Sequence, residues 1–285
     1  MTDSRRYREI GVTPLSKALG AQIDGVDLTQ PLSNSVMQEL KDAFATYSVI
    51  FFRDQSLSPQ QHIDLAEQWG EININRFFKP LDGYPQIAEV IKAPDQKENI
   101  GGTWHTDHSY DQIPAMGSML YARQVPPAGG DTLFSSMTLA FEALSDGMKK
   151  TLLGLNAWHS SRHAFGYGVS DSEHYEDGRL ANPELAVQDA LHPVIITHPL
   201  SGKKALYVNA DFTVRFDGWT IEESQPLLSF LYAHGAREEF TCRFEWQEGS
   251  IALWDNRATW HNAMNDYHGH RRVMHRITLE GVALQ

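Results

Sequence analysis

Residues 101–110, GGTWHTDHSY, place two histidines and an aspartate close together behind a pair of glycines. If this stretch is extended, His105 and Asp107 share one face, because alternate residues of a strand point the same way, about 6.6 Å apart. His108 would then point to the other face. One imidazole and one carboxylate are too few ligands for a tight metal site, so a third must come from elsewhere. We expect it to be His261, which follows a strand-like run in WDNRATWHNA.

Two histidines and one carboxylate on one side of a metal ion leave three coordination positions open, which is the arrangement of non-heme Fe(II) oxygenases. The His-x-Asp pattern alone also fits a capped polar turn, and that alternative stays open at this point. HTDH is similar, too, to the zinc-hydrolase signature H-x-H-x-D-H. The residue two before His105 is Thr103, however, so the first histidine of that signature is missing.

Residues 271–279, RRVMHRITL, predict a strand with Arg272 and Arg276 on one face and mainly apolar residues on the other. In a strand buried on both sides, two arginines require a buried anion, and a guanidinium matches a carboxylate through two parallel hydrogen bonds. Thr132, in the strand after a Gly-Gly turn, could donate a further hydrogen bond to the same anion. The alternatives are an edge strand with exposed arginines, and an ordinary turn and strand around Thr132.

The elements that would position these residues are mainly strands. From about residue 113 onward, short apolar runs alternate with Gly, Pro and Asn turns, a pattern that favours a β-sandwich or jelly roll. The predicted strands cover residues 117–123, 131–136, 193–198, 204–209, 240–246, 250–255 and 271–281.

The N-terminal third mixes strands with helices. Apolar residues at helical spacing predict a helix over 36–47, and the run SVIFF predicts a buried strand over 48–52. Ser58 is followed by a first-turn proline and a capping-box glutamine, which predicts the start of a second helix. A capping box at Thr220 predicts a further helix that ends near residue 235.

The composition is that of an ordinary globular protein, and we expect one domain over residues 1–285 because no repeat or linker divides the chain. The net charge of −12 (24 − 36) argues against nucleic acid and anionic membranes as partners. A single cysteine and the lack of an apolar signal segment favour the cytoplasm, and no apolar run reaches the roughly 20 residues of a membrane helix.

Two stretches, 76–102 and 166–190, are long for plain connections and are expected to be lids over a site.

Motifs along nearly the whole chain resemble the taurine dioxygenase / 2,4-dichlorophenoxyacetate dioxygenase family of Fe(II)- and 2-oxoglutarate-dependent oxygenases. In chain order they are GAQIDGVDL, VIFFRDQ, WHTDHSY, PPAGGDTLF, HPVIITHPLSGKKALYVN, WDNRATWH and RRVMHRITLEG. The resemblance implies a mainly β fold with flanking helices, a cupin-like jelly roll known as the double-stranded β-helix. It also implies a homo-oligomer, either a dimer or a tetramer.

By the same resemblance, His105, Asp107 and His261 are the ligands of Fe(II). Thr132 and Arg272 match the positions that hold the far carboxylate of 2-oxoglutarate, and Arg276 lies towards the metal and the substrate anion. The implied reaction takes 2-oxoglutarate and O2 at the open iron positions, releases succinate and CO2, and hydroxylates a substrate C–H.

The substrate is predicted from the family's substrate-side positions, which correspond to Asn75, Phe78, Gly101, His108, Ala164, Phe165, Phe212 and Arg276. The histidine that taurine enzymes use for the sulfonate is replaced near Asn75, and the asparagine that reads the amine is Gly101. Both departures argue against taurine as the substrate.

Three local stretches, TYSVIFFRDQ, GLNAWHSSRHAFG and EEFTCRFEW, look closer to the (R)-2-aryloxypropionate dioxygenases of the family. We therefore predict a small anionic organic substrate, with an aryloxyalkanoate-type carboxylate ahead of an alkyl sulfate or sulfonate. The alternatives from other classes are a metal-dependent hydrolase and a non-catalytic jelly-roll binding protein.

Overall fold

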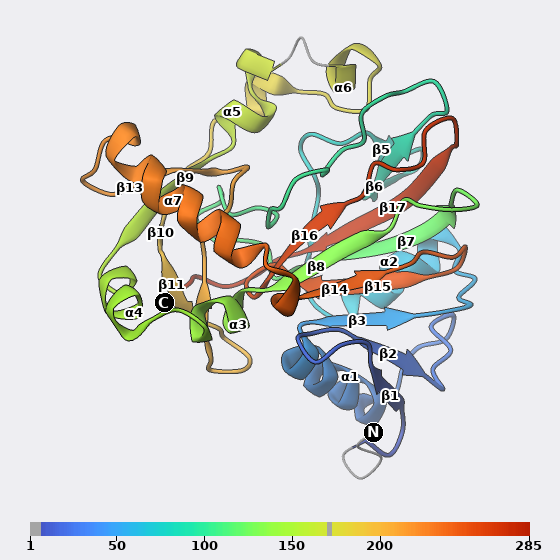
Figure 1. The fold of residues 1–285 in the computed structure, drawn as a ribbon. Coiled ribbons are helices and arrows are strands. Elements are labelled where there is room, and N and C mark those ends of the chain that lie inside the picture. The colour runs from blue at the N-terminus through green and yellow to red at the C-terminus, as the bar shows by residue number, and fades with distance from the viewer. Residues whose placement is uncertain (1–6, 170–172) are drawn as a thin grey trace.

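Two β-sheets packed face to face form the centre of the molecule (Figure 1). The computed structural model describes residues 7–169 and 173–285. The larger, nine-stranded sheet has the order β1 (Gly11–Pro14), β2 (Ala21–Asp24), β3 (Val49–Phe52), β15 (Ile251–Asp255), β7 (Gly117–Gln124), β17 (Arg272–Leu279), β6 (Tyr84–Lys92) and β5 (Pro80–Leu81), with β4 (Ile72–Asn73) paired to β17. The smaller sheet has the order β14 (Thr241–Phe244), β8 (Thr132–Ser136) and β16 (Thr259–Ala263).

Aromatic side chains from both sheets fill the space between them. The ring of Phe51 on β3 stacks on Phe244 of β14 with the centroids 4.1 Å apart, and Phe134 of β8 lies 5.7 Å from Trp254 of β15. Two sheets pack in this way when alternate residues of each strand are apolar and turn inward. The arrangement is the predicted jelly roll, a double-stranded β-helix.

Helices α1 (Asn34–Tyr47) and α2 (Pro59–Glu67) pack on the outer face of the larger sheet through a second apolar core. Helix α2 begins at the predicted capping box of Ser58 and Gln61, whereas α1 begins two residues before the predicted 36–47, with Ser33 as its cap. Helix α7 (Ile221–Gly235) likewise starts at the predicted capping box and contains Pro226. Within the described part of the chain, no helix is long and apolar enough to cross a membrane.

A second group of elements packs beside the sandwich, on the left of Figure 1. It consists of the sheet β10-β9-β13, the pair β11-β12 and the helices α3, α4 and α7 around a shared apolar core. The bounds of these elements are α3 Met137–Glu142, α4 Asp146–Leu152, β9 Asn156–Ser160, β10 Asp189–Pro193, β11 Ile195–Thr197, β12 Lys204–Leu206 and β13 Thr213–Phe216, with a 3-10 turn at Glu238–Phe240 before β14.

The structure corrects the prediction that residues 76–102 form one lid loop. Residues 84–92 of that stretch are β6, which pairs with β17 in the larger sheet. The strand was missed because Pro85 and several half-buried polar residues hide its alternation. Residues 93–102 remain a loop, next to the predicted 166–190 stretch.

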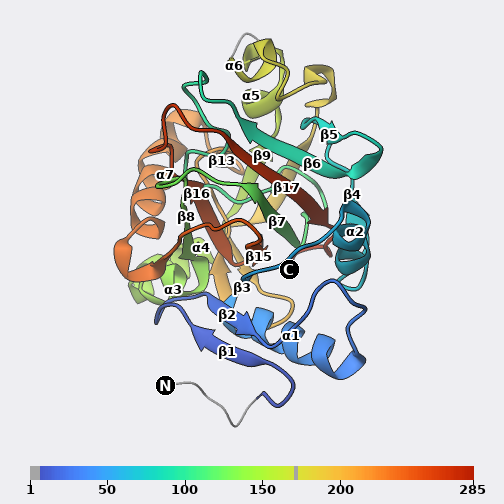
Figure 2. The same ribbon diagram turned by 90° about the vertical axis from the view of Figure 1, so that its right-hand side faces the viewer.

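The 166–190 stretch carries short helical turns rather than a plain loop. They are η1 (Tyr167–Val169), α6 (Glu173–Glu176) and η2 (Pro183–Leu185), and they follow α5 (Arg162–Phe165). Positions 170–172 of the predicted lid lie outside the described residues. In both views, α5 and α6 lie at the end of the molecule that carries β5 and β6, opposite the N-terminus (Figures 1 and 2).

Candidate active site

The structure brings His105, Asp107 and His261 together. One ligand atom from each lies within 4.8 Å of the others, and all three residues are buried. The Nε2 atom of His105 is 3.8 Å from Oδ1 of Asp107, and Nε2 of His261 is 3.7 Å from Oδ2. Two imidazoles and one carboxylate at this spacing fit an iron ion.

A turn, not a strand, brings Asp107 to the two histidines. His105 and His261 form an isolated antiparallel bridge, with N–O distances of 3.1 and 2.8 Å between their backbones. The chain then turns, since His108 has a φ of 58° and its carbonyl accepts a hydrogen bond from Asp111 N. The prediction that TWHTDH is extended is therefore wrong beyond His105. The hydroxyl of Thr106 anchors the turn by donating to the Asn256 carbonyl.

Both histidines direct their Nε2 atoms towards the Asp107 carboxylate. The Thr103 carbonyl, 2.8 Å from Nδ1 of His105, requires the proton on that atom and leaves the Nε2 lone pair for a metal. Burial, with the neighbouring His105 ring adding to it, lowers the pKa of His261 well below its ordinary value. Burial opposes the charge of Asp107, but the adjacent guanidinium of Arg276 outweighs it, so the pKa of Asp107 is lowered and the carboxylate is ionised.

Two side chains hold the Oδ2 atom of Asp107. Arg276 on β17 places Nη2 3.0 Å from it, and the buried hydroxyl of Ser118 on β7 donates to it at 3.1 Å. The Nε atom of Arg276 is buried and finds no hydrogen-bond partner in the described structure. Arg276 can therefore orient Asp107 and still donate to a bound anion. Sequence reasoning missed Ser118, whose only signal is its place on a strand beside the site.

Arg272 is a buried cation without an anion. Its exposed fraction is 5%, its Nε and Nη2 atoms have no hydrogen-bond partner, and it forms no ion pair with any described residue. Burial lowers the pKa of its guanidinium below the ordinary value. Thr132 lies on the neighbouring sheet, and its hydroxyl accepts from Nε1 of Trp246 at 2.9 Å, which leaves the Thr132 proton free to donate. These donors fit the far carboxylate of 2-oxoglutarate.

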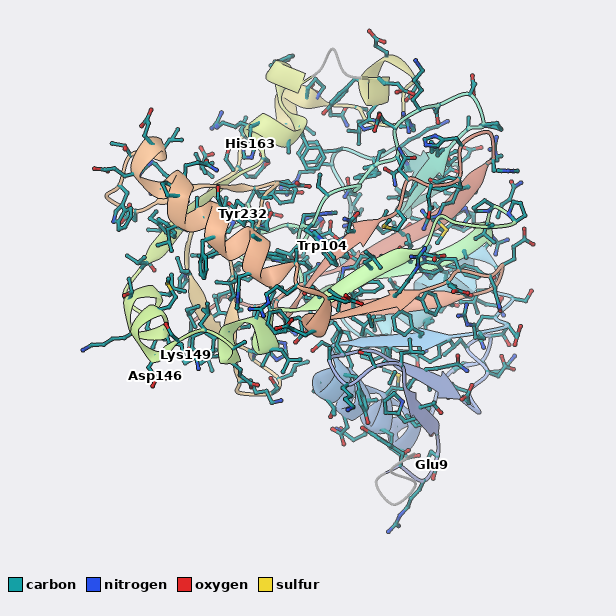
Figure 3. The ribbon with its side chains drawn as sticks, viewed as in Figure 1. Glu9, Trp104, Asp146, Lys149, His163 and Tyr232 are labelled. Carbon is teal, nitrogen blue, oxygen red and sulfur yellow. The ribbon has the colours of Figure 1, made fainter. Side chains whose placement is uncertain are left out.

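A cavity of about 420 Å³ joins the metal site to Arg272. Among the positions predicted to face the substrate, those that line it are Phe78, Gly101, Ala164, Phe165, Phe212 and Arg276. Sequence reasoning missed other lining residues, among them His163, His174, Leu180, Asp211 and Trp254. Figure 3 shows His163 on α5, at the end of the molecule that carries α6, and Trp104 near the centre. The lid elements therefore supply the outer wall of the cavity.

Asn75 and His108, two of the predicted substrate positions, are not among the residues that line this cavity. The side-chain oxygen of Asn75 accepts hydrogen bonds from the backbone of Phe77 and Phe78, each at 2.9 Å, so it shapes the turn that presents Phe78. His108 turns away from the metal, and its Nδ1 lies 2.9 Å from Oδ2 of Asp111.

Gly101 has a structural reason to lack a side chain. Its φ is +80°, and a Cβ atom there would lie 3.2 Å from Cε1 of ligand His105. Glycine is favoured at such a φ and at such a close approach. The absence of a side chain at this position therefore says less about taurine than the sequence comparison implies.

A buried ion network behind the metal site was also missed by sequence reasoning. Asp255, at the end of β15, accepts hydrogen bonds from Nε and Nη2 of Arg257 at 2.9 and 2.7 Å, and it lies 2.9 Å from Nε2 of His198. The same turn contains Asn256, whose carbonyl anchors Thr106. The WDNR motif carried the signal, because an aspartate and an arginine directly after a buried strand need partners.

The fold and the site together define the class of protein: a double-stranded β-helix with two histidines and one carboxylate arranged to fit an iron ion, and with a buried arginine on a neighbouring strand. Comparison with known proteins gives the family. Residues 11–278 match the model of the taurine catabolism dioxygenase TauD, TfdA family, and the chain belongs to that family.

Individual relatives agree with the family. The chain is 34% identical over 277 residues to an alkylsulfatase from Acinetobacter baylyi, and the match covers 96% of this chain and 86% of that protein. It is 31% identical to an alpha-ketoglutarate-dependent 2,4-dichlorophenoxyacetate dioxygenase from Cupriavidus pinatubonensis, covering 93% of this chain and 96% of that one. The crystal structure of a taurine dioxygenase from Burkholderia xenovorans superimposes with a TM-score of 0.82 at 34% identity, over 97% of this chain and 93% of that chain. The protein is thus an Fe(II)- and 2-oxoglutarate-dependent dioxygenase, and the hydrolase and non-catalytic alternatives are set aside.

Proposed function

We propose that this dioxygenase hydroxylates a small organic anion with an apolar body, and that this anion is an aryloxyalkanoate. The observation that carries the proposal is the composition of the cavity wall. Three phenylalanines, Phe78, Phe165 and Phe212, line it together with the metal site and Arg276. With Arg272 assigned to 2-oxoglutarate, an aromatic wall beside Arg276 suits a ligand with one apolar end and one anionic end.

His105, Asp107 and His261 would hold the iron, and Arg272 with Thr132 would hold the far carboxylate of 2-oxoglutarate. When bound, iron and 2-oxoglutarate would together with O2 supply an oxidant able to hydroxylate a C–H bond, with release of succinate and CO2.

Arg276 would hold the anionic group of the substrate close to the metal ligands. Its Nη2 is committed to Asp107, but its buried Nε has no partner within the described residues. A charge-assisted hydrogen bond from this atom would fix one end of the substrate. Its guanidinium also lies over the Phe78 ring, 5.7 Å from the centroid, which ties the anion site to the apolar wall.

The phenylalanines would orient the apolar body and keep water out. Phe165 is stacked on Phe77 at 4.4 Å, and Phe212 packs edge-on against Tyr110 at 4.9 Å. Both rings are therefore held in place before a substrate arrives. A preorganised apolar wall reduces the ordering cost of binding and shields the reacting carbon from solvent.

An alkyl sulfate is the second candidate substrate. The similarity to a protein named alkylsulfatase supports it. A sulfate ester would use Arg276 in the same way as a carboxylate, since a guanidinium donates to the oxygens of either anion.

A substrate panel tests the proposal. Succinate is measured with Fe(II), 2-oxoglutarate and one of four compounds: each enantiomer of a 2-aryloxypropionate, a medium-chain alkyl sulfate, and taurine. We expect the fastest succinate release with an aryloxypropionate and a preference for one enantiomer. The His261→Ala variant, which lacks a metal ligand, serves as the blank. Fast turnover of taurine without activity on the larger anions would contradict the proposal, and a clear preference for the alkyl sulfate would select the second candidate.

A further inference from the structure

Two segments at the lid end of the molecule form the outer wall of the cavity. The first, the rim loop, comprises residues 93–102 and contributes Ile100 and Gly101 to the lining. The second, the lid segment, comprises residues 173–182 and contributes His174 and Leu180. The two segments are far apart in the sequence, so something must hold them together for the wall to exist.

A buried arginine joins the two segments. Arg179 of the lid segment is only 6% exposed. Its Nη1 atom donates to the carbonyl of Glu98 in the rim loop at 2.7 Å, and its Nε atom donates to Asp177 in the lid segment at 2.7 Å. Its Nη2 atom lies 2.6 Å from Asp177 and 3.6 Å from Glu173. One guanidinium therefore contacts both sides of the wall.

The acidic partners of Arg179 also contact the rim loop directly. The side chain of Gln96 donates to Oδ2 of Asp177 at 2.6 Å, and the backbone N–H of Lys97 donates to Oε1 of Glu173 at 3.1 Å. Each carboxylate thus receives a donor from the rim loop while it faces the guanidinium. We call Arg179, Asp177 and Glu173, with these rim-loop donors, the clasp.

The lid segment is also held from its other side, where Leu180 and the half-buried Tyr175 of α6 pack on the apolar cluster around Phe78. These contacts do not involve the rim loop residues that Arg179 and its acidic partners contact. Beyond the clasp, Leu180 forms a bridge with Phe78 and the Tyr175 hydroxyl donates to the Phe165 carbonyl. A buried charge with several partners holds a defined geometry only while its partners remain, because an unpaired buried charge is costly.

We infer that Arg179 is a positioning residue for the substrate. It contacts neither iron nor 2-oxoglutarate, and it acts through the wall residues that it fixes, His174 and Leu180 on one side and Ile100 on the other. The proposal rests on the dioxygenase chemistry of the site and does not depend on which organic anion is the substrate.

The test compares Arg179→Gln with Arg162→Gln. Arg162 is the matched control because it also pairs with an aspartate near the lid, Asp189 at 3.0 Å, but its side chain is 56% exposed and does not reach the rim loop. Hydrogen exchange is followed by mass spectrometry in peptides covering the rim loop and the lid segment. We expect exchange at least tenfold faster in both segments of Arg179→Gln and unchanged exchange in Arg162→Gln.

Kinetics distinguish positioning from general damage. For the best substrate of the panel, we expect KM to rise at least tenfold in Arg179→Gln, while the KM for 2-oxoglutarate and the absorption band formed anaerobically with Fe(II) and 2-oxoglutarate stay unchanged. Because exchange and the band need no substrate, failure of the aryloxyalkanoate proposal would leave them intact. The inference would be overturned if hydrogen exchange rose in neither segment, or rose in the lid segment alone. An unchanged KM for the substrate would also overturn it. If Arg179→Gln does not fold, Glu173→Gln at the 36% exposed end of the clasp replaces it, with the same expected directions.

Discussion

At the scale of single residues, Arg272 is the clearest case of a side chain whose structure demands a ligand. Its guanidinium lies inside the sandwich without an ion pair among the described residues, while burial lowers its pKa. Arg272→Ala should therefore raise the 2-oxoglutarate concentration needed for half-saturation on the order of a hundredfold, since losing a buried charge-assisted contact costs about 3 kcal/mol. The measurement is an anaerobic titration of the Fe(II) protein with 2-oxoglutarate.

Arg271→Ala is the matched control for this titration. Arg271 is the neighbouring residue, has the same side chain and is exposed. It should leave the half-saturation concentration unchanged. If Arg272→Ala also bound 2-oxoglutarate normally, the far carboxylate would have to lie elsewhere.

Single residues also show which parts of the site could be predicted from the sequence. The three candidate metal ligands were predicted from their types and their places in two motifs, and the structure brings them together. Asn75 and His108 were placed at the substrate by the resemblance alone. Their local hydrogen bonds, to the Phe77 and Phe78 backbone and to Asp111, decide their orientation instead.

At the scale of elements, the interface between α2 and β17 buries two histidines. His62 is 1% exposed, and neither of its ring nitrogens has a hydrogen-bond partner among the described residues. Burial, with His275 and Arg123 adding to it, lowers the pKa of His62 to about 3. Burial and Arg123 lower the pKa of His275 to about 4.

These histidines should make the fold sensitive to acid. Below pH 6.5 the unfolded chain binds protons on these histidines that the folded state does not accept. The free energy of unfolding is therefore highest above pH 6.5 and falls as the pH drops towards 4, the pKa of folded His275, and towards 3, the pKa of folded His62. Each such histidine steepens the loss of unfolding free energy by about 1.4 kcal/mol per pH unit. His62→Leu should make the decline shallower, as measured by urea unfolding between pH 7 and 4.5. His268→Leu changes an exposed histidine and should keep the original slope; equal slopes for both variants would refute the assignment.

Elements were predicted well where their local signals were strong. Capping boxes placed the starts of α2 and α7, and alternation placed β17 with Arg272 and Arg276 on its inner face. The strand β6 was missed because its alternation is weak, and the stretch TWHTDH, which was considered as an extended segment, is a bridge followed by a turn. Both errors concern segments whose conformation depends on a distant partner, β17 for one and β16 for the other.

At the scale of the whole molecule, the site draws on residues from positions 105 to 276 and on both sheets of the sandwich. Ligands that bind only the folded state stabilise it by about 2.7 kcal/mol at a hundred times their Kd. Anaerobic Fe(II) with 2-oxoglutarate should therefore raise the unfolding temperature by about 5–10 °C, at roughly 2–4 °C per kcal/mol for a large domain. Thermal scans in sealed cells measure this shift. The His261→Ala variant should show little of it, and an equal shift there would mean that the ligands bind elsewhere.

Other properties of the whole molecule stay predictions. A dimer or tetramer follows from the resemblance and can be measured by light scattering. A single domain and a cytoplasmic location follow from composition. The net charge of −12 also remains relevant, because an acidic molecule must bind an anion such as 2-oxoglutarate through local arginines.

The sequence by itself determined the fold class, the family and the residue types of the metal site, because these follow from local periodicity, capping signals and motif order. Only the tertiary structure decided which residues meet. A turn at Asp107 and a backbone bridge to His261 assemble the candidate metal site. Within the described residues, the Nε and Nη2 atoms of Arg272 have no hydrogen-bond partner, and the clasp around Arg179 joins two segments about 80 residues apart in the chain. The physical reason is that buried charges are satisfied by groups distant in sequence, and their pairing depends on packing that no local pattern encodes.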